Sequence, residues 1–170
     1  MKQGTIPDVW HNTFAQQLRS DLITHWHNER EYTLEVLETM PAKHFSYRPT
    51  VAQNTFAEQL KHTARANTLY FFSFAKDAQI PIDPTSLDKS SLREYVSVTF
   101  EYAGSILSNL SESDFSRRDL SMPFPAKPHT AQDVFLRAYR HTADHRGQLI
   151  CYLRLKGISP PQWRFSPNGR

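Results

Sequence analysis

The sequence has little cysteine and glycine, and it has no long hydrophobic run. Its 170 residues include one cysteine, Cys151, and five glycines. A lone cysteine cannot form a disulfide within the chain, which excludes a disulfide-stapled fold and favours a reducing compartment. The most apolar stretch, residues 69–75, is far shorter than the ~20 residues that cross a bilayer, and no apolar segment of signal-peptide length follows Met1. We therefore expect a cytoplasmic protein with no membrane segment.

The sequence also lacks a strong excess of one charge. Lys and Arg number 20 against 17 Asp and Glu, which gives a formal net charge of +3. The basic side chains of residues 137–156 share that segment with Asp144, and we find no helix-turn-helix, zinc-finger or RNA-binding motif. We therefore expect these side chains to form a solvated face and do not expect a nucleic-acid partner.

Helical periodicity fills most of the chain, and 39% hydrophobic residues supply a core for a single domain over residues 1–170. We predict an all-α four-helix bundle. Capping boxes at Thr55 and Ser91 and a cap at Thr130 open three of its helices, and Gly157 follows the last one. The predicted helices are residues 8–40, with an optional break near residues 20–21, residues 55–77, residues 91–110 and residues 130–156.

The predicted connections, residues 41–54, 78–90 and 111–129, are long for a helical hairpin. We therefore expect at least one of them to cross the bundle rather than join antiparallel neighbours. Residues 122–128 contain three prolines, so we expect an extended connection there.

Eight histidines stand out against the single cysteine. His141 and His145 fall one helical turn apart on one face of the last predicted helix, a spacing that allows both imidazoles to bind one ion. Buried and unpaired, each would cost ~1–3 kcal/mol, so either hydrogen bonds or a metal ion must satisfy them. His62 is the best third candidate, because the second predicted helix is apolar around it. The other histidines are His25 and His27, which remain accessory candidates, and His11, His44 and His129, which we expect at the surface or in caps.

Two motifs resemble a known family. The run His141-Thr-Ala-Asp-His145-Arg-Gly-Gln148, followed by Tyr152-Leu-Arg-Leu-Lys-Gly157, resembles the C-terminal helix of the DinB-like (damage-inducible, YfiT-like) metalloprotein superfamily. Phe45-Ser-Tyr-Arg-Pro49, leading into the helix of His62, is similar to the same family, and the resemblance covers roughly residues 20–161. It implies a four-helix bundle, usually dimeric, that binds one divalent metal ion through His62, His141 and His145. Zinc and nickel both suit such a site.

The sequence departs from a common family pattern at Asn67, where many relatives carry Glu. We therefore do not expect a carboxylate ligand from that helix. Glu58 and Gln148 lie about one turn from His62 and His145 and are candidates to orient the imidazoles, with capping or packing as the alternative role.

An ion held by three neutral imidazoles keeps its double charge and an open position, and it can activate a water or a thiol. The resemblance includes enzymes that use low-molecular-weight thiols. We therefore expect a metal-dependent hydrolase or a thiol S-transferase acting on a small molecule, with no catalytic base identified. Because Cys151 is expected to be packed and inert, a reacting thiol would come from a cosubstrate. The alternative is a non-catalytic metal-stabilised dimer or a stress-related binding module, for which His25 or His27 would close the metal site.

The aromatic residues of the first two predicted helices allow two interpretations. Trp26 and residues 70–74 could line an apolar cavity beside the ion, but an aromatic stripe at helical spacing is more often core. We therefore expect a core role for most of them.

Overall fold

The computed structural model describes residues 8–75, 79–122 and 128–163. Within these ranges the regular secondary structure is helical, apart from an isolated antiparallel bridge between Leu120 and His129. The all-α fold expected from the sequence is confirmed. The α-helices are α1 (Asp8–Thr39), α2 (Phe56–Phe71), α3 (Lys89–Asn109), α4 (Glu112–Phe115) and α5 (Ala131–Leu155), with 3-10 turns at Ala42–His44 and Phe72–Phe74.

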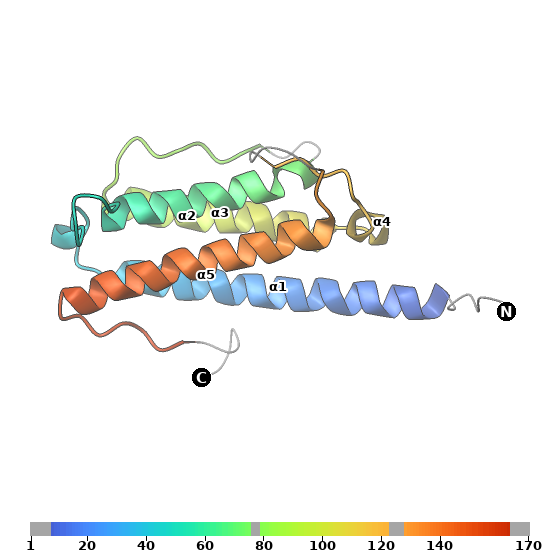
Figure 1. Cartoon of the computed structure of the whole chain (residues 1–170), viewed down its shortest axis with the longest axis horizontal. Coiled ribbons are helices and arrows are strands. Elements are labelled where there is room, and N and C mark those ends of the chain that lie inside the picture. The colour runs from blue at the N-terminus through green and yellow to red at the C-terminus, as the bar shows by residue number, and fades with distance from the viewer. Residues whose placement is uncertain (1–7, 76–78, 123–127, 164–170) are drawn as a thin grey trace.

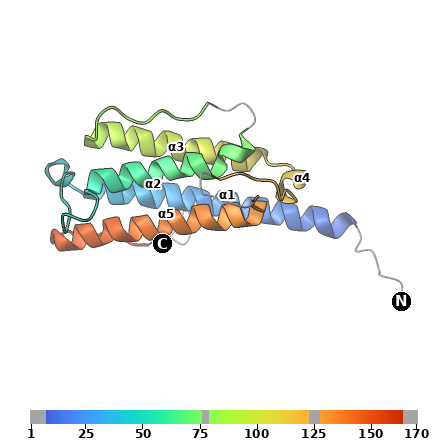
Figure 2. The same ribbon diagram turned by 45° about the horizontal axis from the view of Figure 1, so that its top comes forward.

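The four long helices form a bundle in which α1 and α2 lie diagonally opposite each other (Figure 1, Figure 2). Each of these two helices packs mainly against α3 and α5. α2 and α3 run in one direction, and α1 and α5 run in the other. The chain must therefore return along the bundle between α2 and α3. In the described part of that connection, Asp83 accepts a hydrogen bond from Tyr95 Oη at 2.7 Å and lies 3.1 Å from Lys61 Nζ. The expectation of a crossing connection is confirmed.

The helix boundaries differ from the expected ones in four places. α1 is continuous, so the optional break near residues 20–21 does not occur. α2 ends at Phe71 and tightens into a 3-10 turn, while the expected limit at residue 77 lies outside the described residues. α3 begins at Lys89 because the Asp88 carboxylate, rather than the Ser91 hydroxyl, accepts the capping hydrogen bond. The short helix α4 was not expected. Most of the proline-rich segment 122–128 also lies outside the described residues.

Local signals in the sequence fix the start of α2 and both ends of α5, the two helices that carry the histidines. Thr55 and Glu58 form the expected capping box at the start of α2, and Thr130 caps α5. Gly157 adopts a φ of 69° after α5, and its N–H donates to the Arg154 carbonyl while the next N–H donates to the Leu153 carbonyl. This left-handed cap satisfies carbonyls that a helix end leaves free, and it ends α5 at the expected place.

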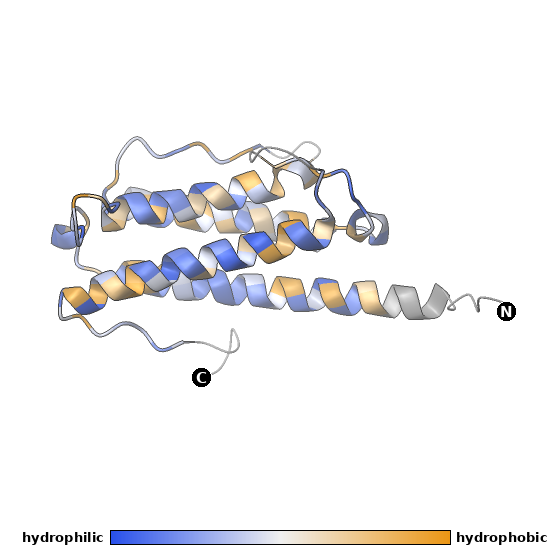
Figure 3. Ribbon diagram, viewed as in Figure 1, coloured by the Kyte–Doolittle hydropathy of each residue, from blue (hydrophilic) through white to orange (hydrophobic). Residues whose placement is uncertain are grey.

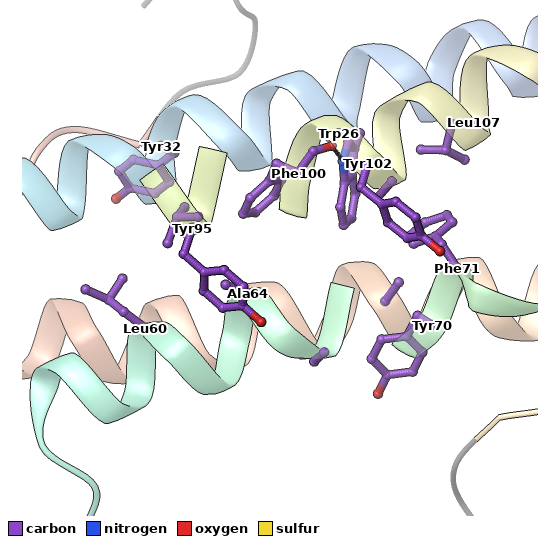
Figure 4. Packing of buried hydrophobic residues seen from close by; sticks show 14 of the residues in the cluster. Trp26, Tyr32, Leu60, Ala64, Tyr70, Phe71, Tyr95, Phe100, Tyr102 and Leu107 are labelled. Atoms are coloured by element: carbon purple, nitrogen blue, oxygen red, sulfur yellow. Dashed lines mark hydrogen bonds between the residues drawn. The ribbon is translucent and has the colours of Figure 1, made fainter. Parts of the chain in front are cut away.

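Trp26 of α1 lies in the core, where it contacts aromatic rings of α2, α3 and α5. Its ring centre is 5.0 Å from that of Phe100 and 5.2 Å from those of Phe71 and Tyr139, and its Nε1–H donates to the Phe100 carbonyl at 2.9 Å. Figure 4 shows Trp26 and Phe100 side by side with Phe71. The core interpretation of the aromatic stripe is thus confirmed for Trp26 and Phe71. Phe72 differs from them, since it is more than half exposed.

The middle of α5 is hydrophilic between two more hydrophobic ends (Figure 3). Its buried side does not pass through His141, His145 and Gln148, which are partly buried or exposed. The interior positions are instead Val134, Phe135, Ala138, Thr142, Arg146, Leu149, Tyr152 and Leu153. The histidines therefore lie at the edge of the buried face, beside α2.

No helix in the described parts of the chain combines the length and the apolar character needed to cross a membrane.

Candidate metal centre

Three histidines meet between α2 and α5, and they are the three singled out by the sequence. α2 carries His62, and α5 carries His141 and His145. One ring nitrogen from each lies within 4.8 Å of the other two. His62 is exposed, and the other two side chains are partly buried. An ion bound by all three would join two helices and stay accessible from solvent.

The spacing of the ring nitrogens fits a shared ion. Nε2 of His62 and Nε2 of His141 are 3.2 Å apart. Two nitrogens that each lie ~2.0–2.1 Å from one ion, at octahedral to tetrahedral angles, are separated by about 2.8–3.4 Å. The ring centre of His145 lies 4.2 Å from that of His141 and 4.6 Å from that of His62. The same nitrogen separation also permits a hydrogen bond between His62 and His141, although Nδ1 of His141 is buried without a hydrogen-bond partner among the described residues.

The surroundings of the three imidazoles favour their neutral forms. Burial, helped by the neighbouring His145 and His62 and opposed by Asp144, lowers the pKa of His141 to about 4. Burial also lowers the pKa values of His145 and of His62, with added lowering from His62 in the first case and from Arg65 in the second. A neutral imidazole is the form that binds a metal ion. The group is therefore ready to coordinate at neutral pH.

Gln59 supports His145, and it was not singled out from the sequence. Its side-chain Nε2 is in hydrogen-bond contact with Nδ1 of His145 and donates to Gln148 Oε1 at 2.8 Å. Gln148, an expected supporting residue, thus reaches His145 through Gln59. Glu58 instead accepts hydrogen bonds from the backbone N–H and the hydroxyl of Thr55, which is the alternative capping role. The one available signal for Gln59 was its position three residues before His62, on a similar side of α2.

Asn67 lies inside the bundle beneath the histidines. It is fully buried, and its Oδ1 accepts a hydrogen bond from Thr142 Oγ1 at 3.3 Å. On the outer side, the Tyr70 ring meets His141 edge to face at 5.5 Å. One aromatic residue of the stripe therefore does adjoin the site.

The accessory candidates on α1 do not join the group. Among the described residues, the cluster close enough to share an ion contains neither His25 nor His27. His27 instead borders a hollow of about 270 Å³ between α1 and α3, across the bundle from the histidines. Trp26 also borders that hollow, so it does not form a cavity beside the ion.

The remaining histidines and the cysteine lie elsewhere. His129 pairs with Asp133 at 2.6 Å near the start of α5, and His44 ends the 3-10 turn that follows α1. The side chain of His11 lies outside the described residues. Cys151 is exposed, so the expectation of a packed thiol is wrong. It does not belong to the histidine cluster.

Arg146 was expected on a solvated basic face, and that expectation is wrong. Its side chain is 6% exposed and is held between α5 and α1 by the Glu29 carboxylate, with one contact at 3.3 Å and one shorter. The guanidinium also lies over the Tyr32 ring, 4.7 Å from its centre. Arg146 therefore belongs to the interior and fixes α5 directly beside His145.

Comparisons with known proteins agree with this fold. The chain is 24% identical to the uncharacterized protein YjoA of Bacillus subtilis over 140 residues, which is 81% of this chain and 90% of YjoA. The crystal structure of that DinB-like protein matches with a TM-score of 0.66 at 22% identity, covering 85% of this chain and 98% of YjoA. A DinB-like protein of Bacillus cereus matches with a TM-score of 0.67 at 16% identity, covering 81% and 92% of the two chains. The DinB superfamily matches residues 25–149, a span that includes α2, α3 and both histidines of α5, and the chain belongs to this superfamily.

Proposed function

We propose that the protein binds one divalent transition metal ion, zinc or nickel, through His62, His141 and His145, and that it is a metal-dependent enzyme. The observation that carries the proposal is the meeting of three imidazole nitrogens from two helices within 4.8 Å. Membership of the DinB superfamily is compatible with metal binding.

The reaction we propose is hydrolysis of a small molecule or S-transfer from a low-molecular-weight thiol. A bound divalent ion would supply Lewis acidity and lower the proton affinity of a water or thiol at its open position. The three imidazoles would hold the ion without adding negative charge, so its full charge stays available. Because the exposed Cys151 lies outside the cluster, a reacting thiol would come from a cosubstrate.

The absence of a fourth ligand within the described residues favours an enzyme over a purely structural metal site. A structural ion usually has four protein ligands, whereas catalytic zinc commonly has three and an open position. The cluster offers three imidazoles and no carboxylate or thiolate.

The homodimer expected from the family resemblance remains part of the proposal, and sedimentation of the purified protein tests it.

Metal analysis tests the site. The protein is purified without an affinity tag or added metal, next to the single variants His62→Ala, His141→Ala and His145→Ala. The control is His27→Ala, which removes an exposed imidazole across the bundle. We expect about one ion per chain in wild type and control, and a clear loss in the three cluster variants. Equal metal content in all five proteins would contradict the assignment.

An activity screen separates the two reactions. Esters, amides and small electrophiles are offered with and without low-molecular-weight thiols, each in the presence and absence of a chelator. Turnover that requires a thiol and stops with chelator supports S-transfer, and turnover that needs water alone supports hydrolysis. Metal binding without turnover across the panel would favour the non-catalytic alternative.

A further inference from the structure

The Gln59 side chain covers one of the two ring nitrogens of His145. Gln59 is 2% exposed, and its amide Nε2 is in hydrogen-bond contact with Nδ1 of that ring. Nδ1 is therefore closed to any ion. The nitrogen of His145 that remains for coordination is Nε2, the same atom that His62 and His141 direct toward each other.

A neutral imidazole carries one proton, and its amide partner decides which nitrogen holds it. When the Gln59 NH2 group donates to Nδ1, Nδ1 must be the bare nitrogen and the proton sits on Nε2. A protonated Nε2 has no lone pair for an ion. If the amide turns by a half rotation, Oε1 faces the ring, accepts a hydrogen bond from Nδ1–H and leaves Nε2 bare. The two amide orientations therefore correspond to a ring that cannot coordinate through Nε2 and a ring that can.

The two side-chain amides that form hydrogen bonds with Gln59 can turn when the Gln59 amide turns. Gln148 Oε1 accepts from Gln59 Nε2 at 2.8 Å, and Asn54 Nδ2 donates to Gln59 Oε1 at 3.4 Å. Both partners are side-chain amides, and both are exposed enough to turn. After rotation Gln148 donates its NH2 to Gln59 Oε1, and Asn54 presents its own oxygen to Gln59 Nε2. Each hydrogen bond is retained with donor and acceptor exchanged, so neither state leaves a buried group unpaired.

We propose that Gln59 is the positioning residue that selects the tautomer of His145, and that its amide reverses when a metal ion takes Nε2. The inference rests on the proposed metal site. In the metal-free protein Gln59 donates to Nδ1, and in the metal-loaded protein it accepts from Nδ1–H.

Two substitutions at Gln59 separate hydrogen bonding from packing. Gln59→Leu keeps an apolar side chain of similar size and removes the partner of Nδ1. Gln59→Glu supplies a carboxylate, which can only accept and so holds the proton on Nδ1. The matched control is Thr63→Val, which removes a buried hydroxyl one turn later on α2 that donates to the Gln59 carbonyl at 2.8 Å.

Zinc affinity is measured by competition with a chromophoric chelator. Loss of a partner that orients a metal-bound histidine typically weakens binding about 10–100-fold. We expect that loss in Gln59→Leu, binding at least as tight as wild type in Gln59→Glu, and a change of less than about threefold in Thr63→Val. Equal affinity of Gln59→Leu and wild type would overturn the inference, and so would equal weakening of Gln59→Leu and Gln59→Glu.

Nitrogen NMR of the imidazole rings reads the tautomer directly and needs no activity. In the metal-free state we expect the His145 proton on Nε2 in wild type and on Nδ1 in Gln59→Glu. Addition of zinc should move the wild-type proton to Nδ1, where it exchanges slowly with solvent, and in Gln59→Leu that proton should exchange faster. The same tautomer in metal-free wild type and Gln59→Glu would refute control by Gln59. If wild type binds no zinc, the proposed function fails, and the metal-free comparison still decides whether Gln59 selects the tautomer.

Discussion

Replacing Arg146 with methionine should destabilise the bundle strongly, because it strands a carboxylate between α1 and α5. Arg146 and Glu29 form an ion pair in which the two side chains are 6% and 19% exposed. Removing one partner of a buried pair costs about 3–5 kcal/mol, since the remaining charge has lost both water and its counter-charge. The residual exposure of Glu29 lets water reach it in part. We therefore expect a loss near the lower end, ~3 kcal/mol, for Arg146→Met.

The reasoning also predicts how the two side chains act together. Replacing both partners by apolar residues removes the attraction and the desolvation penalty at once, and such exchanges are often nearly neutral. The double variant Glu29→Leu with Arg146→Met should therefore be more stable than Arg146→Met alone, by about 2 kcal/mol. Arg140→Met, on an exposed position of the same helix, is the control and should change stability by less than about 0.5 kcal/mol.

Urea unfolding of the metal-free protein, followed by far-UV circular dichroism and by tryptophan fluorescence, measures these differences. Agreement between the two signals checks that unfolding is two-state. Two results would refute the reasoning. One is an Arg146→Met variant as stable as the control, and the other is a double variant that loses the sum of the two single changes, which would mean that the charges do not interact.

Three further predictions concern the core, a cap and the response to pH. Trp26→Phe removes the Nε1–H bond to the Phe100 carbonyl and should cost about 1–3 kcal/mol in urea unfolding, whereas an unchanged midpoint would contradict the assigned bond. Asp88→Ala should cost about 1 kcal/mol and Ser91→Ala clearly less, because Asp88 caps α3, and the opposite ranking in thermal unfolding would restore the original expectation. The folded-state pKa of His141, about 4, lies below its ordinary value of 6.5, so the folded protein binds fewer protons than the unfolded chain between these values. The stability of the metal-free protein should therefore be greatest above pH 6.5 and fall as the pH drops toward 4, and unfolding curves across this range should show a shallower fall in His141→Gln.

The sequence was sufficient to predict the four long helices, though not the short helix α4, because most of their signals are local. Thr55, Thr130 and Gly157 act within one turn of their own positions, and each does what its residue type predicts. The exception at the start of α3 has the same local character. Asp88 lies three residues before Ser91, and its carboxylate accepts hydrogen bonds from the Ser91 backbone N–H and hydroxyl and from the Ser90 hydroxyl. The Ser91 hydroxyl donates to the Asp88 carboxylate and so does not act as the capping acceptor. The Asp88 carboxylate takes that role instead.

The buried residues around the candidate site could not be predicted, because they depend on contacts between helices. The spacing of residues along one helix does not reveal such contacts. A line drawn by spacing along α5 follows the histidines, yet the buried face runs through Thr142 and Arg146, the residues directly after them. Their partners, Asn67 and Glu29, come from α2 and α1. The composition of α5 does not indicate that an arginine in it pairs with a partly buried carboxylate on another helix. The same holds for Gln59, whose role depends on which helix lies beside α2.

These buried polar contacts explain why the two histidines of α5 can sit at the edge of the interior and still be held in place. Apolar side chains tolerate a small rotation of a helix, because their contacts have no preferred direction. The hydrogen bond from Thr142 and the ion pair of Arg146 do have one, and they connect α5 to α2 and to α1 respectively. A rotation of α5 by one residue, about 100°, would break both contacts and would also turn His141 and His145 away from His62. A single orientation of α5 about its axis therefore pairs Thr142 with Asn67 and Arg146 with Glu29, and in that orientation the three imidazoles meet.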